Sequence, residues 1–271
     1  MVETVTPGTS SGYSPAAVLV ELNDRNPPLA AVTVLTSALF AGFLVGIATD
    51  PRTLAGEPVW LKPAKFAGSI ALFTGSLAWL TPHLGAPDGV LRTASRGIAA
   101  GMVVEIALIG GQAARGVESH FNTATSLDTA VYALMGATIV GSVGLLAWLL
   151  ARSWRLESDI APAFAWGIRL GVLLFVVGSF QGGAMNAISG AATGSGPTLP
   201  VVRWNLGGDF RVAHFVGLHA IEVLPLVGYA TARSHQRGRL QRPLLVVAVA
   251  TAAYVVVLAA AFAFAVAPLL G

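Results

Sequence analysis

Residues 244–270, with the sequence LLVVAVATAAYVVVLAAAFAFAVAPLL, contain no charged side chain. A helix needs about 17 to 25 mainly apolar residues to cross the hydrocarbon core of a membrane, and this stretch is long enough. Six other stretches are similar, and the seven predicted spans lie near residues 30–49, 65–82, 97–114, 128–151, 161–181, 212–232 and 244–269. The sequence therefore predicts an all-α, polytopic integral membrane protein built as a seven-transmembrane helix bundle.

The composition of the chain agrees with this class. Its 271 residues are 55% hydrophobic and only 11% charged, with a mean hydropathy of +0.72, whereas soluble domains carry roughly 25% charged residues. The net charge of +3 is small and dispersed, so no nucleic-acid partner is expected. The absence of cysteine excludes disulfides, thiolate metal sites and covalent c-type haem attachment.

Residues 1–29 form a polar segment ahead of the first span, and residues 30–271 are expected to form a single transmembrane domain. Ser14 and Pro15 favour the start of a short interfacial helix through Leu22, because Ser suits the N-cap and Pro the first helical position. The segment lacks a basic leader followed by an apolar core and a small-residue cleavage site, so no cleaved signal peptide is predicted.

The distribution of basic residues orients the predicted bundle, because Lys and Arg collect in short cytoplasmic loops. The N-terminal segment and the loops after spans two, four and six hold nine basic residues: Arg25, Arg92, Arg96, Arg152, Arg155, Arg233, Arg237, Arg239 and Arg242. The opposite end holds six: Arg52, Lys62, Lys65, Arg115, Arg203 and Arg211. We therefore expect a cytoplasmic N-terminus and an outer C-terminus, and the Arg, Ala, Gly and Val bias favours a bacterial plasma membrane.

Two carboxylates lie inside the predicted spans. Glu105 is ten residues inward of Arg115, and Glu222 is eleven residues inward of Arg211. At 1.5 Å per residue both lie about 15 Å inside, near the bilayer midplane. Ionisable groups at this depth mark working sites by default, so Glu105, Glu222 and the neighbouring His219 are predicted as catalytic residues. If spans three and six touch, the two acids would meet and would share a proton or bind a cation. The alternative is that each carboxyl group only forms hydrogen bonds between helices.

Three histidines are the candidate metal ligands. His120, His214 and His219 would bind a transition metal or haem, since neutral imidazoles are common ligands of both. His214 and His219 are five residues apart, which suits one small metal ion poorly on a regular helix, although Pro225 could bend the segment. Histidines that simply bond between helices are the alternative.

Two known classes of seven-span protein can be compared with these residues. A retinal protein is excluded, because the seventh span has no lysine to form a Schiff base. The set Ser119, His120, Asp128, His214 and His219 loosely resembles that of the Ser/Asp/three-His metal hydrolases. Those enzymes carry their late histidines four apart on the last helix, whereas here they are five apart on the sixth, so no family is assigned.

Cationic and amide side chains gather at the outer helix ends, where they would surround a pocket that opens outward between spans three and six. The predicted ligand-binding residues are Lys62, Lys65, Gln112, Arg115, Asn122, Gln181, Asn186 and Arg211. Arginine forks suit phosphate and carboxylate groups, so the expected partner besides the lipid bilayer is an amphipathic anionic small molecule or lipid. In the competing interpretation the cations pair with Glu118, Asp128 and Asp209.

Three functions remain open from the sequence. The first is a membrane-embedded enzyme or redox protein that uses a metal or haem and acts on an amphipathic anionic substrate. The second is a proton- or ion-coupled transporter in which Glu105 and Glu222 titrate. The third is a noncatalytic assembly subunit or receptor whose polar groups only position the helices. The first is favoured, because the polar residues gather at one end of the predicted bundle. The inner half of the spans has almost no polar residues that could line a transport path.

Overall fold

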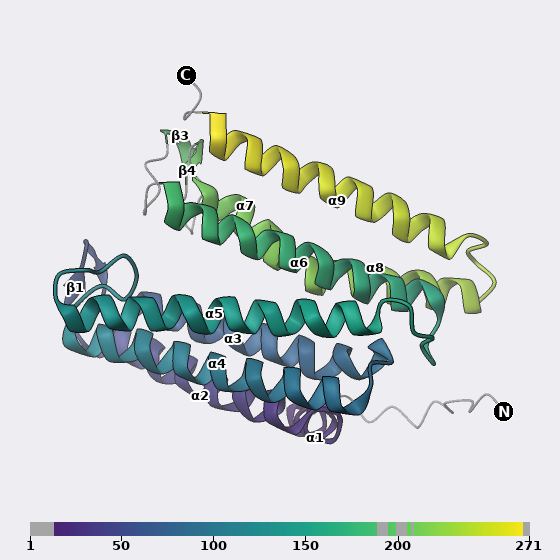
Figure 1. Ribbon diagram of the computed structural model, residues 1–271, viewed down its shortest axis with the longest axis horizontal. Helices are drawn as coiled ribbons and strands as arrows, with labels where there is room; N and C mark the ends of the chain where they lie inside the picture. The colour runs from purple at the N-terminus through teal and green to yellow at the C-terminus, as the bar shows by residue number, and fades with distance from the viewer. Residues whose placement is uncertain (1–13, 189–194, 199–204, 208, 268–271) are drawn as a thin grey trace.

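The computed structural model describes residues 14–188, 195–198, 205–207 and 209–267, and long helices lying side by side dominate it (Figure 1). The helices are α1 (Pro15–Arg25), α2 (Pro27–Thr49), α3 (Leu61–Leu80), the short 3-10 helix η1 (Thr81–Leu84), α4 (Asp88–Arg115), α5 (Ser126–Ser153), α6 (Pro162–Ile188), α7 (Phe210–Leu218), α8 (Ala220–Gln236) and α9 (Pro243–Val266). Two small antiparallel hairpins, β1 (Thr53–Leu54) with β2 (Glu57–Pro58) and β3 (Ser195–Thr198) with β4 (Asn205–Gly207), lie at one end.

Six helical segments in the described residues are long and apolar enough to cross a membrane: α2, α4, α5, residues 162–183 of α6, the α7–α8 segment and α9. The best 18-residue window of α9 has a mean hydropathy of 2.6, yet only 11% of it is buried. An apolar surface left uncovered by protein is what a lipid-facing helix needs. The prediction of a helical, multi-pass membrane protein is confirmed at this level.

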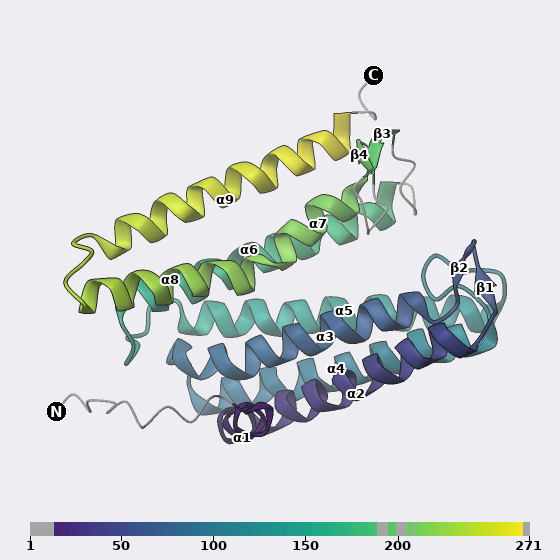
Figure 2. The ribbon, with the colours of Figure 1, turned by 180° about the vertical axis from the view of Figure 1, so that it is seen from behind.

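Helix α3 is not among those six segments, although it was predicted as the second span. Its first two turns carry both lysines of the chain, Lys62 and Lys65, and these lower its hydropathy. The helix nevertheless packs closely on α2 and runs alongside the other long helices (Figure 2). Its buried face includes Ala67, Thr74 and Leu77.

The helices form two groups that are visible in both views (Figures 1 and 2): α1 to α5, and α6 to α9. Helix α5 packs on α6, and α3 reaches the second group through side-chain contacts at three successive levels. Phe73 stacks on Phe175 of α6, with ring centroids 4.8 Å apart. One turn further along, Ser76 reaches the α8 residue Glu222, and Trp79 packs against Phe164 of α6.

Glycines bring α6 into backbone contact with α7 and α8. A Cβ atom added to Gly178 would lie 2.4 Å from the Cα atom of Gly217, and one added to Gly171 would lie 2.7 Å from the carbonyl oxygen of Ala220. A Cβ on Gly228 would lie 2.5 Å from a carbonyl oxygen of α6. Small residues allow this approach between membrane helices, so the position of the α7–α8 segment is fixed by its fit to α6.

The predicted sixth span is interrupted at His219, which ends α7 and precedes α8. The amide of Glu222 bonds to the carbonyl of His219, three residues back, at 3.2 Å, while the amide of Val223 makes the regular four-residue bond to the same carbonyl at 3.1 Å, so the helix tightens locally at this step. Pro225 lies one turn beyond and removes the amide that would bond to Ile221. The interruption places Glu222 in the first turn of α8.

Candidate functional site

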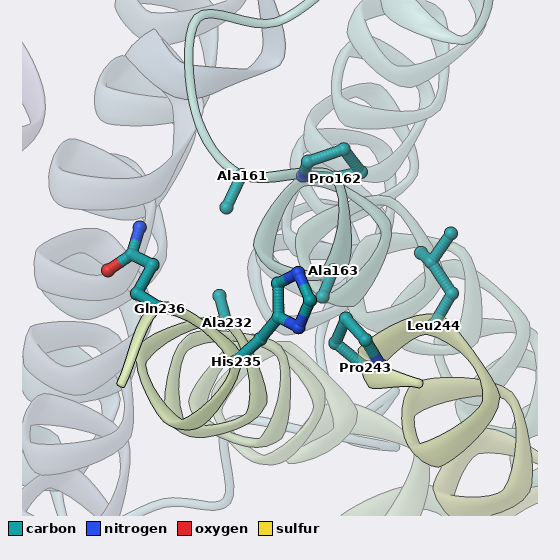
Figure 3. Close-up of a pocket in the computed structure, with 8 residues that line it drawn as sticks. All are labelled: Ala161, Pro162, Ala163, Ala232, His235, Gln236, Pro243 and Leu244. Carbon is teal, nitrogen blue, oxygen red and sulfur yellow. The ribbon is translucent and has the colours of Figure 1, made fainter. Parts of the chain in front are cut away.

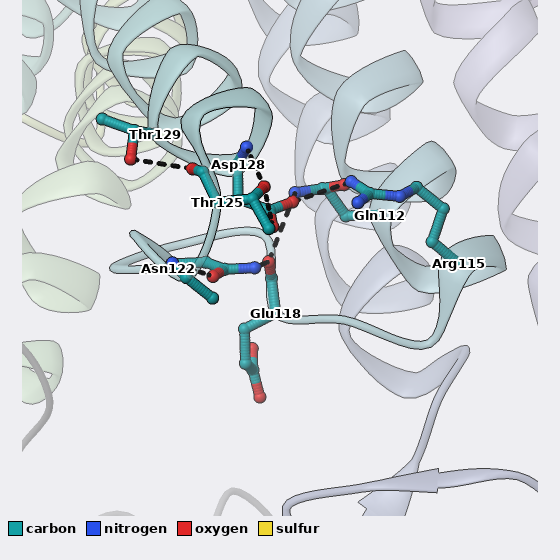
Figure 4. A network of polar contacts seen from close by, with 8 residues as sticks. Gln112, Arg115, Glu118, Asn122, Thr125, Asp128 and Thr129 are labelled. Atoms are coloured by element: carbon teal, nitrogen blue, oxygen red, sulfur yellow. Dashed lines mark hydrogen bonds and ion pairs between the residues drawn. The ribbon is translucent and has the colours of Figure 1, made fainter.

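The C-terminal end of α4 and the start of α5 are joined by a polar cluster centred on Asp128 (Figure 4). The Asp128 carboxylate accepts hydrogen bonds from Gln112 at 3.0 Å, Arg115 at 2.7 Å and the Thr125 hydroxyl at 2.7 Å. Arg115 also donates to the side-chain oxygen of Gln112. Asp128 and Gln112 are only 2% and 3% exposed, so this buried acid is fully occupied by protein donors.

The loop between α4 and α5 closes over this cluster. The carbonyl oxygen of Glu118 accepts hydrogen bonds from Gln112 at 3.5 Å and from Asn122 at 2.9 Å (Figure 4). The Glu118 carboxylate forms an ion pair with Lys62 at 3.2 Å, which ties the loop to α3. Asn122 therefore supports the loop backbone through its amide group.

Most cations of the predicted outer rim are paired with carboxylates. Lys62 pairs with Glu118, Arg115 with Asp128, and Arg211 with Asp209, whose side chain is 0% exposed. Arg52 pairs with Asp50 in the same way, and the Arg52 guanidinium holds the pKa of Asp50 well below its ordinary value. Lys65 is the exception within the described residues, where it is exposed with no ion pair. Protein carboxylates therefore hold most of these cations, which is the alternative that the sequence left open to a pocket for an anionic ligand.

His120 lies in the α4–α5 loop among aromatic rings. Its Nδ1 atom is 3.0 Å from the Ser119 hydroxyl, and its ring packs against Phe66 of α3 and Tyr132 of α5. Burial, together with the charge of Lys62, lowers the pKa of His120 to about 4. The imidazole is therefore neutral at physiological pH.

Glu105 is buried between α4 and α5. Its side chain is 2% exposed, and its carboxylate accepts a hydrogen bond from the hydroxyl of Thr138 at 3.3 Å. Thr138 lies ten residues along α5 from Asp128, just as Glu105 lies ten residues from Arg115, so the two meet at one depth. This matched spacing was the signal in the sequence that would have identified Thr138 as a partner.

Glu222 lies at the boundary between the two helix groups. Its Oε2 atom is 3.3 Å from Nδ1 of His219 and its Oε1 atom is 3.4 Å from the hydroxyl of Ser76 on α3. Tyr254 of α9 donates a hydrogen bond to the carbonyl of Val216, just before the α7–α8 interruption. The Glu222 carboxylate therefore joins α8 to α3, and α9 is bonded to α7 nearby. Ser76 and Tyr254 were missed because nothing in the sequence marks which helices are neighbours.

The predicted meeting of the two carboxylates needs correction. Among the described residues α4 packs mainly on α5, α2 and α3, while α8 packs mainly on α6 and α9. The hydrogen bond of Glu222 runs to Ser76 of α3 and not to α4. Glu105 and Glu222 thus have different partners on different helices.

The three histidines predicted to bind a metal are also separated. His214 bonds through Nδ1 to the carbonyl of Gly178 at 2.8 Å, His219 faces Glu222, and His120 belongs to the outer loop. In the part of the chain that the structure describes, no three His, Asp or Glu side chains gather closely enough to hold a metal ion. The three predicted ligands therefore do not gather at one metal site.

Two predicted ligand-binding residues lie at the end of α6. Gln181 is partly buried, and its side-chain oxygen has no hydrogen-bond partner. Asn186 lies in the last turns of α6, but its side chain lies outside the described residues. The neighbouring Gly182 faces the ring of His214, so Gln181 belongs to the same end of the α6–α7 contact.

Two pockets lie at the opposite end of the molecule, near the α8–α9 turn. One, of about 250 Å³, is mainly apolar and is lined by Ala161, Pro162, Ala163, Ala232, His235, Gln236, Pro243 and Leu244 (Figure 3). The other, of about 270 Å³, is lined by Tyr229, Ala230, Arg233, Ser234, Arg237 and Arg239. The second pocket is rich in arginine, and in the described residues these arginines form no ion pair, unlike most cations at the other end of the molecule.

Comparison of the chain with protein-family models, curated proteins and solved structures finds no match.

Proposed function

We propose that the chain is a proton- or ion-coupled membrane transporter in which the Glu222–His219 pair exchanges the coupling proton or cation. The observation that carries this proposal is the interruption of the helix at His219, which puts Glu222 in the first turn of α8 and within hydrogen-bond distance of Ser76. Discontinuous membrane helices form the ion and substrate sites of many transporters. Glu222 also lies where the two helix groups meet, so a change in its charge acts on their contact.

Within this proposal α3 also crosses the membrane, which brings the number of spans to seven. The N-terminus is cytoplasmic and the C-terminus lies outside, in a bacterial plasma membrane. The support is that α3 lies alongside its neighbours and carries buried residues along its length. Its lysines lie in the first two turns, from which they can reach the membrane surface with their charged ends. The excess of arginines at the α8–α9 end favours the cytoplasm there.

Glu105 is the second titrating group of the proposal. It is 2% exposed and its hydrogen-bond donor is a neutral hydroxyl, Thr138, so no cation compensates its charge within the described contacts. Carboxylates of this kind in membrane helices mark proton and ion paths. Glu105 belongs to the first helix group and Glu222 joins the second group to α3, so each group contains a titratable acid.

The experiment reconstitutes the full chain in liposomes that contain a pH-sensitive dye and exposes them to a panel of carboxylate- and phosphate-bearing solutes under an imposed pH gradient. We expect internal acidification that requires both the protein and one of the solutes. Glu222→Gln should abolish it, because the amide cannot exchange a proton. Glu157→Gln is the matched control, since this exposed acid lies in the α5–α6 loop.

The noncatalytic alternative predicts a different result from the same variants. If Glu222 only joins α8 to α3, Glu222→Gln lowers the melting temperature of the purified protein and leaves solute-dependent acidification unchanged. That result would replace the transport proposal with a structural role for the carboxylate.

A further inference from the structure

The end of α8 forms a cationic pocket whose arginines have no acidic partner among the described residues. The pocket of about 270 Å³ includes three guanidinium groups, from Arg233, Arg237 and Arg239. The ion pairs of the described residues involve other cations. Charge of one sign gathered around a concavity attracts an anion.

The geometry of the helix end builds this pocket. Gly238, with φ +70°, adopts the left-handed conformation after α8. Its amide bonds to the carbonyl of His235 at 2.9 Å, and the amide of Arg239 bonds to the carbonyl of Ser234 at 3.0 Å. This pair of bonds is the Schellman motif, which turns the chain sharply back over the helix end. Arg239 is thereby brought to the same pocket as Arg237.

Arg233 is held in place on the pocket wall by Tyr229. Its guanidinium donates a hydrogen bond to the phenol oxygen at 2.7 Å and lies 5.9 Å from the centre of the ring. Both residues are exposed, so the guanidinium remains open to a ligand. A guanidinium held in this way loses less conformational freedom when it binds an oxyanion.

Below the arginines the same face of α8 is apolar. At 100° per residue Val223, Leu226, Arg233 and Arg237 fall within one face of about 80°, with Glu222 and Tyr229 beyond one edge of it. Leu226 is 64% exposed and Val223 is 39% exposed. From Leu226 to Arg237 the helix rises about 16 Å, which is close to half the thickness of the hydrocarbon core. This length matches an acyl chain below a charged headgroup.

We propose that this pocket binds the phosphate headgroup of an anionic phospholipid, with its acyl chain along Leu226 and Val223. Arginine forks hold phosphate oxygens bidentately, and Ser234 adds a hydroxyl donor at the pocket wall. Basic pockets on the cytoplasmic side of membrane proteins bind such headgroups. The inference uses the membrane placement of the chain and does not depend on proton coupling.

The test measures binding of phosphatidylglycerol and phosphatidylcholine to the full-length protein in detergent by native mass spectrometry. The wild type should retain phosphatidylglycerol in preference to phosphatidylcholine. The double variant Arg237→Gln/Arg239→Gln should bind phosphatidylglycerol at least about tenfold more weakly. The matched control is Arg92→Gln/Arg96→Gln, which removes the same charge from exposed positions of α4 outside the pocket and should change binding by less than about threefold.

Two further arms separate the remaining explanations. Tyr229→Phe removes only the oxygen that holds Arg233 and should weaken phosphatidylglycerol binding by a smaller factor than the double variant. Inorganic phosphate at millimolar concentration should not displace the lipid, since it lacks the acyl chain. Equal losses of binding in the pocket and control variants would show general attraction of the lipid to surface charge. Displacement of the lipid by phosphate would show a site for free anions. Either result, or unchanged binding in the pocket variant, overturns the proposal.

Discussion

Arg115 in the last turn of α4 places a guanidinium nitrogen 2.7 Å from the carboxylate of Asp128 in the first turn of α5. Each charge has the sign that its helix end favours, because a cation suits the C-terminus of a helix and an anion the N-terminus. The pair therefore stabilises both helix ends at once and fixes how α4 meets α5. Gln112 and Thr125 complete the hydrogen bonds of the acid.

Removal of the acid should cost far more stability than removal of the base. Asp128→Ala leaves Gln112 and Thr125 without their acceptor in a buried position, and we expect a loss of about 3 kcal/mol. Arg115→Gln should cost about 1 kcal/mol, because the guanidinium side chain is 41% exposed. Thermal melting of the purified protein in detergent measures both, with Asp24→Asn on exposed α1 as a control within about 0.5 kcal/mol. Equal losses for Asp128→Ala and Asp24→Asn would contradict the cluster.

The contact between α6 and α7 should not tolerate a methyl group. Gly178→Ala places a Cβ 2.4 Å from the backbone of Gly217, which cannot move without separating the helices, so we expect misfolding or a loss of more than about 3 kcal/mol. Gly144→Ala on α5 meets nothing within 4 Å and should stabilise by about 0.5 to 1 kcal/mol, because alanine favours helix more than glycine. Size-exclusion profiles and melting temperatures report the contrast, and a well-folded Gly178→Ala protein would refute the backbone contact.

Depth along each helix could be predicted from the sequence, because residue spacing converts directly into distance at 1.5 Å per residue. The spacing of Glu105 from Arg115 correctly indicates a group far inside its helix, and the matching spacing of Thr138 from Asp128 contains its partner as well. The lysines of α3 were visible too, although the pairing of Lys62 with Glu118 was only one of two options. Properties that depend on a single helix were therefore within reach.

The neighbours of each helix could not be predicted in the same way. Lipid is as apolar as a helix surface, so hydrophobic pattern does not tell a helix which partner it packs against. The choice follows from shape, such as the close fit of Gly178 to Gly217, and from single polar contacts such as Ser76 to Glu222. A meeting of Glu105 and Glu222 was inferred from their depth alone, and it is wrong because α4 and α8 pack mainly on different helices.

Acidification between pH 6.5 and about 4 should destabilise the protein through its buried histidines. The pKa of His120 is lowered from 6.5 to about 4, and burial and the nearby Arg25 lower that of His83. The unfolded chain therefore binds protons in this window that the folded chain does not, so stability is full above pH 6.5 and falls as the pH drops toward 4. The pKa of Asp50 is lowered from 3.8 in the folded chain, so its stabilising contribution is full above that pH and is lost only as the pH falls below it.

The variant His120→Asn separates this contribution from the others. Asparagine does not titrate, so the fall in melting temperature between pH 6.5 and 4 should be smaller in the variant than in the wild type. His235→Asn, at an exposed position of the α8–α9 turn, serves as the control. An unchanged slope for His120→Asn would contradict a buried, neutral imidazole at this position.

Site-specific labelling decides whether α3 crosses the membrane, and the chain is suited to it because it contains no cysteine. Thr53 and Asp88 are exposed residues beyond the two ends of α3, in β1 and at the start of α4. With seven spans and an outer C-terminus, Thr53→Cys should react with a membrane-impermeant maleimide on intact cells. Asp88→Cys should react only after the membrane is permeabilised, and the unmodified chain should not react at all.

Each alternative topology gives its own labelling pattern. If α3 lies on the membrane surface, both cysteines react from the same side, and the bundle has the six spans that hydropathy alone identifies. If the orientation is reversed, Asp88→Cys reacts on intact cells and Thr53→Cys does not. Reversal would also place the arginine pocket of α8 on the outer face. The larger number of basic residues would then lie outside, whereas they are expected in cytoplasmic loops. The two cysteines therefore test the span count and the orientation independently.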